Sequence, residues 1–312
     1  MHVIPTQKPR LAVIVGPTAV GKTQTGMKYA FQLGGEIVNA DSMQVYRRMD
    51  IGTAKPSAND RTAVPHHLID IVDPDEDFNV SIFVRLARNV IHQLHDRSKP
   101  VFVVGGTGLY IRALIGGLLR SQDPDYELRE FYRSQVNNYG IDYLYGQLQT
   151  RDPESAFKIN PHDTVRIIRA LEVLDLMGHP IAELQRSHQF MEKPYIVLKI
   201  GLTMEKQALF QRIDERIDQM IKGGLIEEVR MLLQMGYDET CKAMQSLGYR
   251  HILAYLKGSL TLDDAVRRMK RDSRSYAKRQ MTWFKKEPDI HWFLLPDNMD
   301  RIGETISTYF LE

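Results

Sequence analysis

The sequence contains a single cysteine, Cys241, among 312 residues. One thiol excludes an internal disulfide framework, and no second cysteine is present to share a zinc site. A chain of this kind fits a reducing compartment, so we expect it in the cytoplasm. His66 and His67 stand together, but no further metal-ligating residues lie near them at suitable spacing, so we interpret them as structural.

Long hydrophobic runs are also missing. The N-terminal residues MHVIPTQKPR lack the apolar stretch of a signal peptide, and no apolar run approaches the roughly 20 residues that span a bilayer. We therefore expect a soluble protein with no membrane partner. The hydrophobic content is 43%, so a chain of this length can bury a sizeable core, in one large domain or two smaller ones.

Acidic residues are scarce in one segment, residues 267–286. Between Arg267 and Lys286 nine basic residues accompany one acid, Asp272, although the whole chain has a net charge of only +2. A helix with so few acids lacks ion-pair partners of its own, whereas the backbone of a nucleic acid would supply them. We interpret this segment as a nucleic-acid contact, with a solvated helix face as the alternative.

What the chain does contain is an alternation of strand and helix patterns at both ends. Strands are predicted for LAVIV, GEIVNA, VFVVGG and YIVLKIGL, and helices for SIFVRLARNVIHQLHDR and residues 204–235. From about residue 120 to 193 the strand patterns disappear and helical segments remain. The predicted fold class is α/β: a P-loop NTPase-like core with a mostly parallel sheet, over residues 1–119 and 194–312, with an inserted all-helical subdomain at 120–193.

The first predicted strand leads directly into the pattern G-x-x-x-x-G-K-T. Its glycines let backbone N–H groups point at an anion, the following helix adds its positive end, and Lys22 supplies a mobile charge. Thr23 offers a hydroxyl to Mg²⁺, the expected cofactor. The predicted diphosphate site consists of Gly16, Pro17, Thr18, Ala19, Val20, Gly21, Lys22 and Thr23. The pattern does not specify what lies beyond the phosphates.

A nucleoside triphosphatase usually has a second acidic site, where an apolar strand ends in Asp or Glu near the metal. Here the strand VFVV ends in two glycines and Thr107, and HLIDIVDP is a weak substitute. The acid that stands out is Asp41, after the second strand, at the sheet edge where α/β proteins bind ligands. It is suited both to capping a short helix beginning at Ser42 and to acting as a general base, and the residues alone leave both roles open.

Six motifs occur together and in order: GPTAVGKT, DSMQVYRRMDIGTAKP, PHHLID, GGTGLY, NPHDTVRIIRALEV and RSYAKRQMTWF. In sequence and spacing, over nearly the whole chain, they resemble the tRNA dimethylallyltransferases, also called tRNA isopentenyltransferases. The resemblance implies that the loop holds dimethylallyl diphosphate. It implies transfer of the dimethylallyl group to the exocyclic amine of the adenosine next to the anticodon (position 37), which forms N6-(dimethylallyl)adenosine and releases diphosphate.

The expected partners are therefore dimethylallyl diphosphate and the anticodon arm of tRNA, and we expect a monomer. Eukaryotic relatives carry a C-terminal zinc finger that is not found here, which suggests a bacterial-type enzyme and agrees with the single cysteine. His251 stands where many relatives have Glu or Gln, so the role of that position is left open.

The resemblance also implies roles for individual residues. Asp41 is the expected general base, Thr107 lies at the substrate channel, and Arg216 helps to hold the diphosphate. From the residues alone, Arg216 would more simply pair with a neighbouring carboxylate such as Asp214, Glu215 or Asp218.

A further set of residues is expected to face tRNA. By resemblance these are Asp41, Ser42, Met43, Gln44, Thr107, Arg129, Val165, Arg166, Ile167, Ile168 and Arg169, and the basic C-terminal segment adds Arg274, Lys278 and Arg279. Ile167 and Ile168 are equally explained as core residues of a helix. Five tyrosines of the insertion have two open interpretations, packing and stacking on bases: Tyr126, Tyr132, Tyr139, Tyr143 and Tyr145.

Two functions of other classes compete with this hypothesis. A small-molecule or nucleotide kinase would use the loop for ATP, and a non-catalytic RNA-binding protein would carry the loop as a relic. The basic segment at 267–286 argues against the kinase, which needs no long polyanion footprint. The intact sequence Gly21-Lys22-Thr23 argues against the relic.

Overall fold

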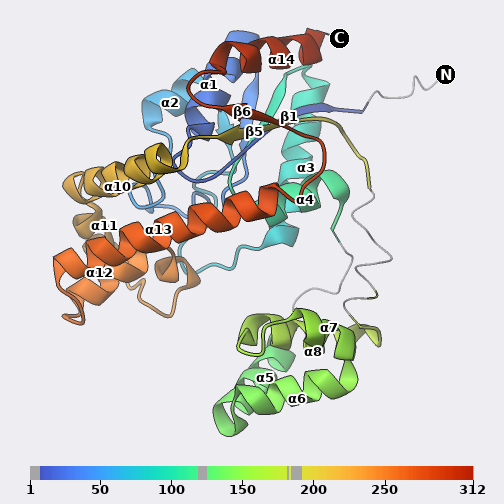
Figure 1. Cartoon of the computed structure of the whole chain (residues 1–312), viewed down its shortest axis with the longest axis vertical. Helices are drawn as coiled ribbons and strands as arrows, with labels where there is room; N and C mark the ends of the chain where they lie inside the picture. The colour runs from blue at the N-terminus through green and yellow to red at the C-terminus, as the bar shows by residue number, and fades with distance from the viewer. Residues whose placement is uncertain (1–7, 119–124, 181–182, 184–191, 312) are drawn as a thin grey trace. The chain divides into compact units, whose positions relative to one another are not determined.

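The computed structural model describes residues 8–118, 125–180, 183 and 192–311. The chain divides into two compact units (Figure 1): Met1–Ile115 together with Lys193–Glu312 form one, and Gly116–Glu192 form the other. These divisions lie close to the expected ends of the helical insertion. No helix in the described part of the chain is long and apolar enough to cross a membrane.

A six-stranded sheet in the order β3-β2-β4-β1-β5-β6 forms the centre of the first unit, and every paired neighbour is parallel. The strands are β1 (Arg10–Val15), β2 (Glu36–Asn39), β3 (His66–His67), β4 (Val101–Val104), β5 (Ile196–Thr203) and β6 (Ile290–Leu294). The mostly parallel α/β sheet is therefore confirmed. β3 and β6 were not predicted, because β3 has two residues and β6 is a largely exposed edge strand without a continuous apolar run.

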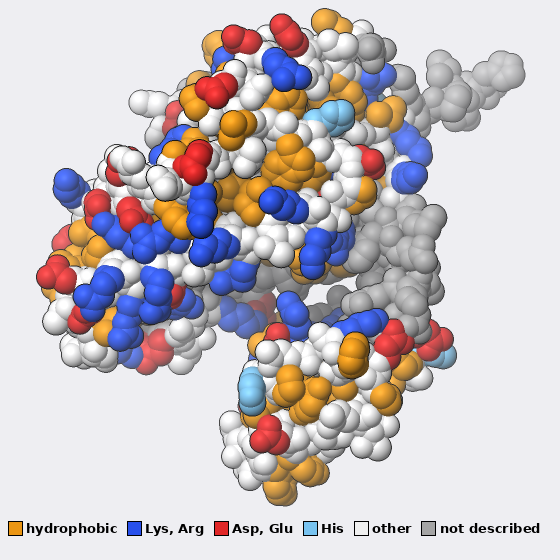
Figure 2. Space-filling model, viewed as in Figure 1, with side chains coloured by type: hydrophobic (Ala, Val, Ile, Leu, Met, Phe, Trp, Pro, Cys, Tyr) orange, Lys and Arg blue, Asp and Glu red, His pale blue; other side chains and the backbone are white. Residues whose placement is uncertain are grey.

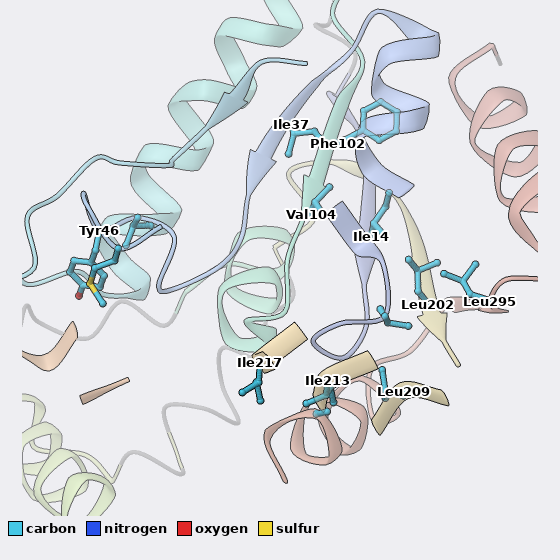
Figure 3. Close-up of a cluster of buried hydrophobic side chains, with 14 of the residues drawn as sticks. Ile14, Ile37, Tyr46, Phe102, Val104, Leu202, Leu209, Ile213, Ile217 and Leu295 are labelled. Atoms are coloured by element: carbon cyan, nitrogen blue, oxygen red, sulfur yellow. The ribbon is translucent and has the colours of Figure 1, made fainter. Parts of the chain in front are cut away.

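β4 is apolar along its whole length and β1 is apolar after Arg10, as is typical of strands whose two faces are both covered. Leu11, Ala12, Val13 and Ile14 of β1 have no exposed surface. Figure 3 shows Ile14, Ile37, Phe102 and Val104 packed together on neighbouring strands. Because β1 lies between β4 and β5, the loop that follows it opens at the middle of the carboxyl edge of the sheet.

Helices of the first unit surround this sheet. They are α1 (Lys22–Leu33), α2 (Ala58–Ala63), α3 (Val80–Asp96), α4 (Gly108–Gly116), α10 (Lys206–Lys222), α11 (Leu225–Gln234), α12 (Tyr249–Leu256), α13 (Leu262–Phe284) and α14 (Met299–Leu311). The predicted helix over 204–235 is two helices, α10 and α11, because Gly224 has a φ of 98° and ends the regular backbone. The long helix α13 crosses the unit and packs against α10 and α12 (Figure 1).

Helices alone make up the described part of the second unit. They are α5 (Tyr126–Tyr139), α6 (Ile141–Arg151), α7 (Pro153–Lys158) and α8 (Thr164–Met177). Asp125, Asp152 and Asp163 cap α5, α7 and α8 by accepting hydrogen bonds from backbone N–H groups. Leu144, Leu148 and Leu171 belong to a separate hydrophobic core, so this unit has its own packing. The backbone N–H of Glu192 donates to Gly116 O (3.1 Å), which brings the two ends of the inserted chain together.

Candidate active site

The glycine-rich loop takes the tight path that its sequence predicts. Gly16 has a φ of 148°, and a Cβ at this position would lie 2.5 Å from the carbonyl oxygen of Leu202 on the neighbouring strand. Only glycine fits this close approach. α1 begins directly after Gly21, so its free N–H groups and its positive end face the anion site inside the loop.

Lys22 lies within this loop. Its Nζ donates a hydrogen bond to Pro17 O (2.7 Å). Burial away from water lowers the pKa of Lys22 to about 8, with a smaller lowering from Arg216, while Asp41 acts in the opposite direction. A bound diphosphate would place a negatively charged partner beside this ammonium group.

Asp41 follows β2 at the same edge of the sheet. Its Oδ1 accepts hydrogen bonds from the backbone N–H groups of Met43 (2.8 Å) and Gln44 (3.3 Å). The expectation of a helix beginning at Ser42 is wrong, because residues 42–48 form turns rather than a helix. The other carboxylate oxygen of Asp41, Oδ2, accepts no hydrogen bond from the described residues. The turn-stabilising role and the general-base role are thus compatible, because each uses a different oxygen.

Thr107 supports the turn that carries Asp41. Its Oγ1 accepts a hydrogen bond from the N–H of Ser42 (3.1 Å), and its own N–H donates to Ala40 O (3.3 Å). Thr107 lies beside the cavity described below and is not among the residues that line it. The structure therefore gives its hydroxyl a positioning contact with the turn that carries Asp41.

Arg216, on α10, does not pair with the neighbouring acids. Asp214 binds Arg274 (2.6 Å), Asp218 binds Lys270 (2.6 Å), and Glu215 accepts from Gln211 (2.8 Å). No carboxylate within the described ranges forms an ion pair with Arg216, and burial lowers the pKa of its guanidinium group. The alternative of a local ion pair is excluded for this conformation, and Arg216 lines both of the cavities described below.

Two cavities adjoin the loop. The first, of about 420 Å³, combines polar groups with an apolar wall. Its polar lining includes Asp41, Thr23 and Arg216, and its apolar lining includes Met43, Ile213, Ile217, Met220, Leu247 and Met269. The second, of about 800 Å³, is lined by polar groups such as Lys28, Lys55, Arg212 and Gln219. Lys22, Thr23 and Arg216 line both, so the anion-binding groups lie where the two cavities meet.

The IGTAKP segment, which lines both cavities, is held by buried groups that the sequence analysis missed. The carboxylate of Glu228 accepts hydrogen bonds from the N–H groups of Asp50 (3.0 Å), Ile51 (2.7 Å) and Gly52 (3.2 Å), and from the hydroxyl of Tyr249 (2.5 Å). The amide of Gln44, which lines the first cavity, donates to the carbonyl groups of residues 53 and 54, and its contact with tRNA stays a prediction. These partners are far apart in sequence, so no local pattern could identify them.

The basic helix α13 has more acidic partners than its own sequence suggests. Four ion pairs neutralise part of it: Arg267–Asp264, Lys270–Asp218, Arg271–Asp272 and Arg274–Asp214. The expectation that the segment lacks partners is therefore wrong for these residues, because α10 supplies two of the acids. In the part of the chain that the structure describes, five cations of the segment form no ion pair: Arg268, Lys278, Arg279, Lys285 and Lys286. Figure 2 shows basic side chains gathered over the region of α13 and α12.

In the helical unit, the residues expected to face RNA separate into two groups. Val165 is 79% exposed, and Arg166 is also exposed. Ile167 and Ile168 are buried in the core of the unit, which corrects the expectation that the whole stretch faces RNA. Arg129 and Arg169 both bind the buried carboxylate of Glu172, at 2.8 and 2.6 Å.

The tyrosines of this unit divide in the same way. Tyr132 is buried with its hydroxyl on Asp175, and Tyr145 donates to Ala156 O (2.9 Å), so both are packing residues. Tyr126, Tyr139 and Tyr143 are exposed. Stacking on bases remains a prediction for these three.

The histidines considered in the sequence analysis form hydrogen bonds with backbone groups and with neighbouring acids. His67 contacts Glu36 (2.7 Å), and His66 contacts Val64 O (2.7 Å). Nδ1 of His251 accepts from the N–H of Gly248 (3.3 Å) while Nε2 contacts Asp272 (3.1 Å), and burial lowers the pKa of this imidazole. His251 therefore joins the start of α12 to α13.

The groups at the loop fit a Mg²⁺ ion that arrives with the diphosphate. Thr23 lines both cavities, and Asp41 lies in the first of them. Among the described residues, no cluster of three or more His, Cys, Asp or Glu could hold a metal ion by itself. Oxygen ligands from the diphosphate and water would complete the coordination that one hydroxyl begins.

The fold and this site define a class: a P-loop α/β protein in which the loop lysine and the carboxylate of Asp41 line one partly apolar cavity. Two family models match the chain, one described as IPP transferase over residues 44–287 and one described as Isopentenyl transferase over residues 9–68. The chain is 53% identical to tRNA dimethylallyltransferase 2 of Syntrophus aciditrophicus, over 95% of each chain. It is 48% identical to tRNA dimethylallyltransferase of Geobacter metallireducens, over 97% of this chain and 98% of that one.

Solved structures similar to this chain belong to the same family. A tRNA isopentenylpyrophosphate transferase from Bacillus halodurans is 42% identical, with a TM-score of 0.73 and 97% of each chain covered. A eukaryotic dimethylallyltransferase acting on tRNA is 30% identical, with a TM-score of 0.82, over 97% of this chain and 79% of that one. The chain belongs to the tRNA dimethylallyltransferase (IPP transferase) family.

Proposed function

We propose that the enzyme transfers the dimethylallyl group of dimethylallyl diphosphate to the exocyclic amine of the adenosine next to the anticodon of tRNA. One observation carries the proposal: Lys22, Arg216 and Asp41 line a single cavity whose lining also includes apolar side chains from α10 and α13. The two cations can bind a diphosphate, and the methionine and isoleucine side chains can pack against a five-carbon chain. The carboxylate can accept the proton of an amine. A kinase would not need the apolar wall next to its phosphate site.

The reaction makes a nitrogen–carbon bond and breaks a carbon–oxygen bond. The lone pair of an adenine amine is delocalised into the ring, so catalysis depends on positioning, proton removal and stabilisation of the leaving group. In the proposed step the amine nitrogen bonds to the first carbon of the dimethylallyl group, the bonding electrons leave with the diphosphate, and Oδ2 of Asp41 takes the amine proton.

The leaving diphosphate is held by the loop N–H groups, Lys22 and Arg216. Arg216 is suited to this because its guanidinium is not neutralised by a neighbouring acid in the described residues. Mg²⁺, bound through Thr23 and the diphosphate oxygens, would supply additional positive charge for the leaving group.

The proposed acceptor is a macromolecule, and the enzyme must therefore reach a base that is normally stacked in RNA. Such a base must be turned out of the stack before it can enter a cavity. Lys278 and Arg279 of α13 are the proposed phosphate contacts, and Val165 and Arg166 of the helical unit add exposed groups. We further propose that the enzyme is cytoplasmic, because a single cysteine fits a reducing compartment. We also propose that it acts as a monomer, because one chain contains all the groups that the proposed step needs.

The proposal is tested by incubating the protein and Mg²⁺ with unmodified tRNA, with dimethylallyl diphosphate in one reaction and ATP in another. Mass spectrometry of the nuclease-digested RNA should show a dimethylallyl gain on one adenosine in the first reaction alone. No gain there, together with consumption of ATP and phosphorylation of a small molecule, would replace the proposal with the kinase hypothesis.

A further inference from the structure

One buried polar side chain of α13 joins the two loops at the active site. Gln280 is 7% exposed, and both ends of its amide are bonded to backbone. The N–H of Thr18, in the diphosphate loop, donates to Oε1 (2.8 Å), and Nε2 donates to the carbonyl oxygen of Gly106, after β4 (3.0 Å). A single side chain of the basic helix thus connects the end of β1 with the end of β4.

Helix α13 packs directly against the loop after β4. A Cβ at Gly106 would lie 2.3 Å from Nε2 of Gln280, and a Cβ at Gly108 would lie 2.2 Å from the ring of Trp283. The glycines of the GGTG sequence therefore allow α13 to approach. Any shift of α13 along this contact must move the amide that holds Thr18.

The contact at Gly106 is also connected to the turn that carries Asp41. Gly106 precedes Thr107, whose hydroxyl holds the Ser42 end of the turn that carries Asp41. On α13, the residues before Gln280 are Lys278 and Arg279, which have no carboxylate partner in the described ranges. One turn of helix thus presents cations for RNA and an amide for the diphosphate loop.

We propose that Gln280 is a positioning residue that fixes the shape of the diphosphate loop and couples RNA binding on α13 to diphosphate affinity. The inference rests on the proposed function, in which α13 contacts tRNA. A loop that is already held in its binding shape loses less conformational freedom when the anion arrives, so its affinity is higher. If RNA steadies α13, it strengthens diphosphate binding through Gln280, and the diphosphate must strengthen RNA binding by the same factor.

The test compares two variants. Gln280→Met keeps the approximate volume of the side chain and removes both hydrogen bonds, whereas Gln280→Glu keeps an acceptor for Thr18 but places a carboxylate against Gly106 O. Thr282→Ala, an exposed position on the same helix, is the matched control. Affinity for inorganic pyrophosphate with Mg²⁺ is measured by titration calorimetry with and without unmodified tRNA, and thermal melting reports the fold.

For the native protein and Thr282→Ala, we expect tRNA to increase pyrophosphate affinity. In Gln280→Met, pyrophosphate affinity without RNA should fall about tenfold, the order of magnitude expected from two lost hydrogen bonds, and the tRNA enhancement should disappear. The KM for dimethylallyl diphosphate should rise more than kcat falls. Gln280→Glu should also lose the enhancement, and its affinity should fall at least as far, because its carboxylate lies beside the diphosphate loop. Its response to tRNA decides the question if the Met variant does not fold.

Failure of the inference and failure of the proposed function give different results. If the native protein binds no pyrophosphate, the proposed use of the loop is wrong. If the native protein binds it, and the folded Gln280 variants bind it equally well and respond equally to tRNA, then Gln280 does not have the positioning role.

Discussion

At the scale of single residues, the active site depends on side chains that serve two purposes with different atoms. Oδ1 of Asp41 holds the backbone of its own turn, and Oδ2 is left for the substrate. Lys22 contacts Pro17 O but lacks a carboxylate at ion-pair distance within the described residues. In the proposed reaction, the substrate supplies the charges that these groups bind.

Asp41→Asn should separate the two purposes of Asp41. The amide oxygen can still accept from Met43 N–H, but the side chain no longer removes a proton. We expect dimethylallyl transfer to fall by about 100-fold or more, the range typical of a lost general base, while thermal stability and tRNA affinity stay near native. Asp41→Ala should lose transfer and also about 1 kcal/mol of stability, because the turn contact is removed. Unchanged single-turnover rates in either variant would eliminate the base role.

Lys22 predicts a pH dependence of diphosphate binding. Its pKa in the free protein is lowered to about 8, so the ammonium is charged below this pH and neutral above it. Pyrophosphate affinity should therefore fall as pH rises through about 8, by up to about tenfold per pH unit, until the loop amides and Arg216 alone hold the anion. Titrations between pH 7 and 10 would show this, and Lys22→Met should be weak at every pH. A native profile without a decline would contradict the assignment.

At the scale of elements, α13 carries charges of two kinds. Those paired to Asp214 and Asp218 join α13 to α10, Arg267 pairs with Asp264 on α13 itself, and the cations toward the C-terminal end have no such partners among the described residues. Lys278 Nζ lies 5.5 Å from the centroid of the Phe210 ring, so its position is supported without being neutralised.

The double change Lys278→Gln and Arg279→Gln should weaken tRNA binding. It should reduce the slope of log affinity against log salt by about 1.5, because two phosphate contacts are lost. The matched control is Arg267→Gln with Lys270→Gln, which removes two paired charges and should change the slope much less. Filter-binding measurements at several salt concentrations distinguish the two. Equal slopes in both double variants would show that the footprint lies elsewhere.

Glu228 of α11 predicts a large effect on stability from a small chemical change. Its carboxylate accepts three backbone N–H bonds and one hydroxyl, and Glu228→Gln would replace one acceptor with a donor that faces other donors. We expect a loss of about 2–4 kcal/mol in the free energy of unfolding, since buried groups are left unsatisfied. Chemical denaturation measures this, and Glu227→Gln, at the exposed neighbouring position, is the control and should change little.

At the scale of the whole molecule, the helical unit is an insertion whose first and last residues lie close to each other. Replacing residues 117–191 with a short Gly-Ser turn should leave the P-loop unit folded, because Gly116 and Glu192 are already hydrogen-bonded and the two cores are separate. Pyrophosphate affinity should remain within about threefold of native, because the loop and its supports lie outside the insertion. tRNA affinity should fall. An aggregated product or lost pyrophosphate binding would show that the units depend on each other for folding.

Local patterns predicted the parts of this fold that depend on local chemistry. The glycine-rich loop, the four apolar strands and the helix over SIFVRLARNVIHQLHDR follow from residue spacing alone. Glu228, Gln280 and the acids that pair with α13 could not be predicted, because their partners lie on elements remote in sequence. The edge strand β6 was missed because its half-exposed residues IHWFL lack the continuous burial that marks central strands.

The position of β1 in the sheet has a consequence for the order of events during synthesis. β1 pairs with β4 on one side, but its partner on the other side, β5, follows the whole helical unit in the chain. As the protein leaves the ribosome, the helical unit, with its sequence-local contacts, is able to fold while β1 still lacks one neighbour. The anion-binding loop therefore acquires its final shape late, after Leu202 has emerged to pack against Gly16 and after α13 has delivered Gln280.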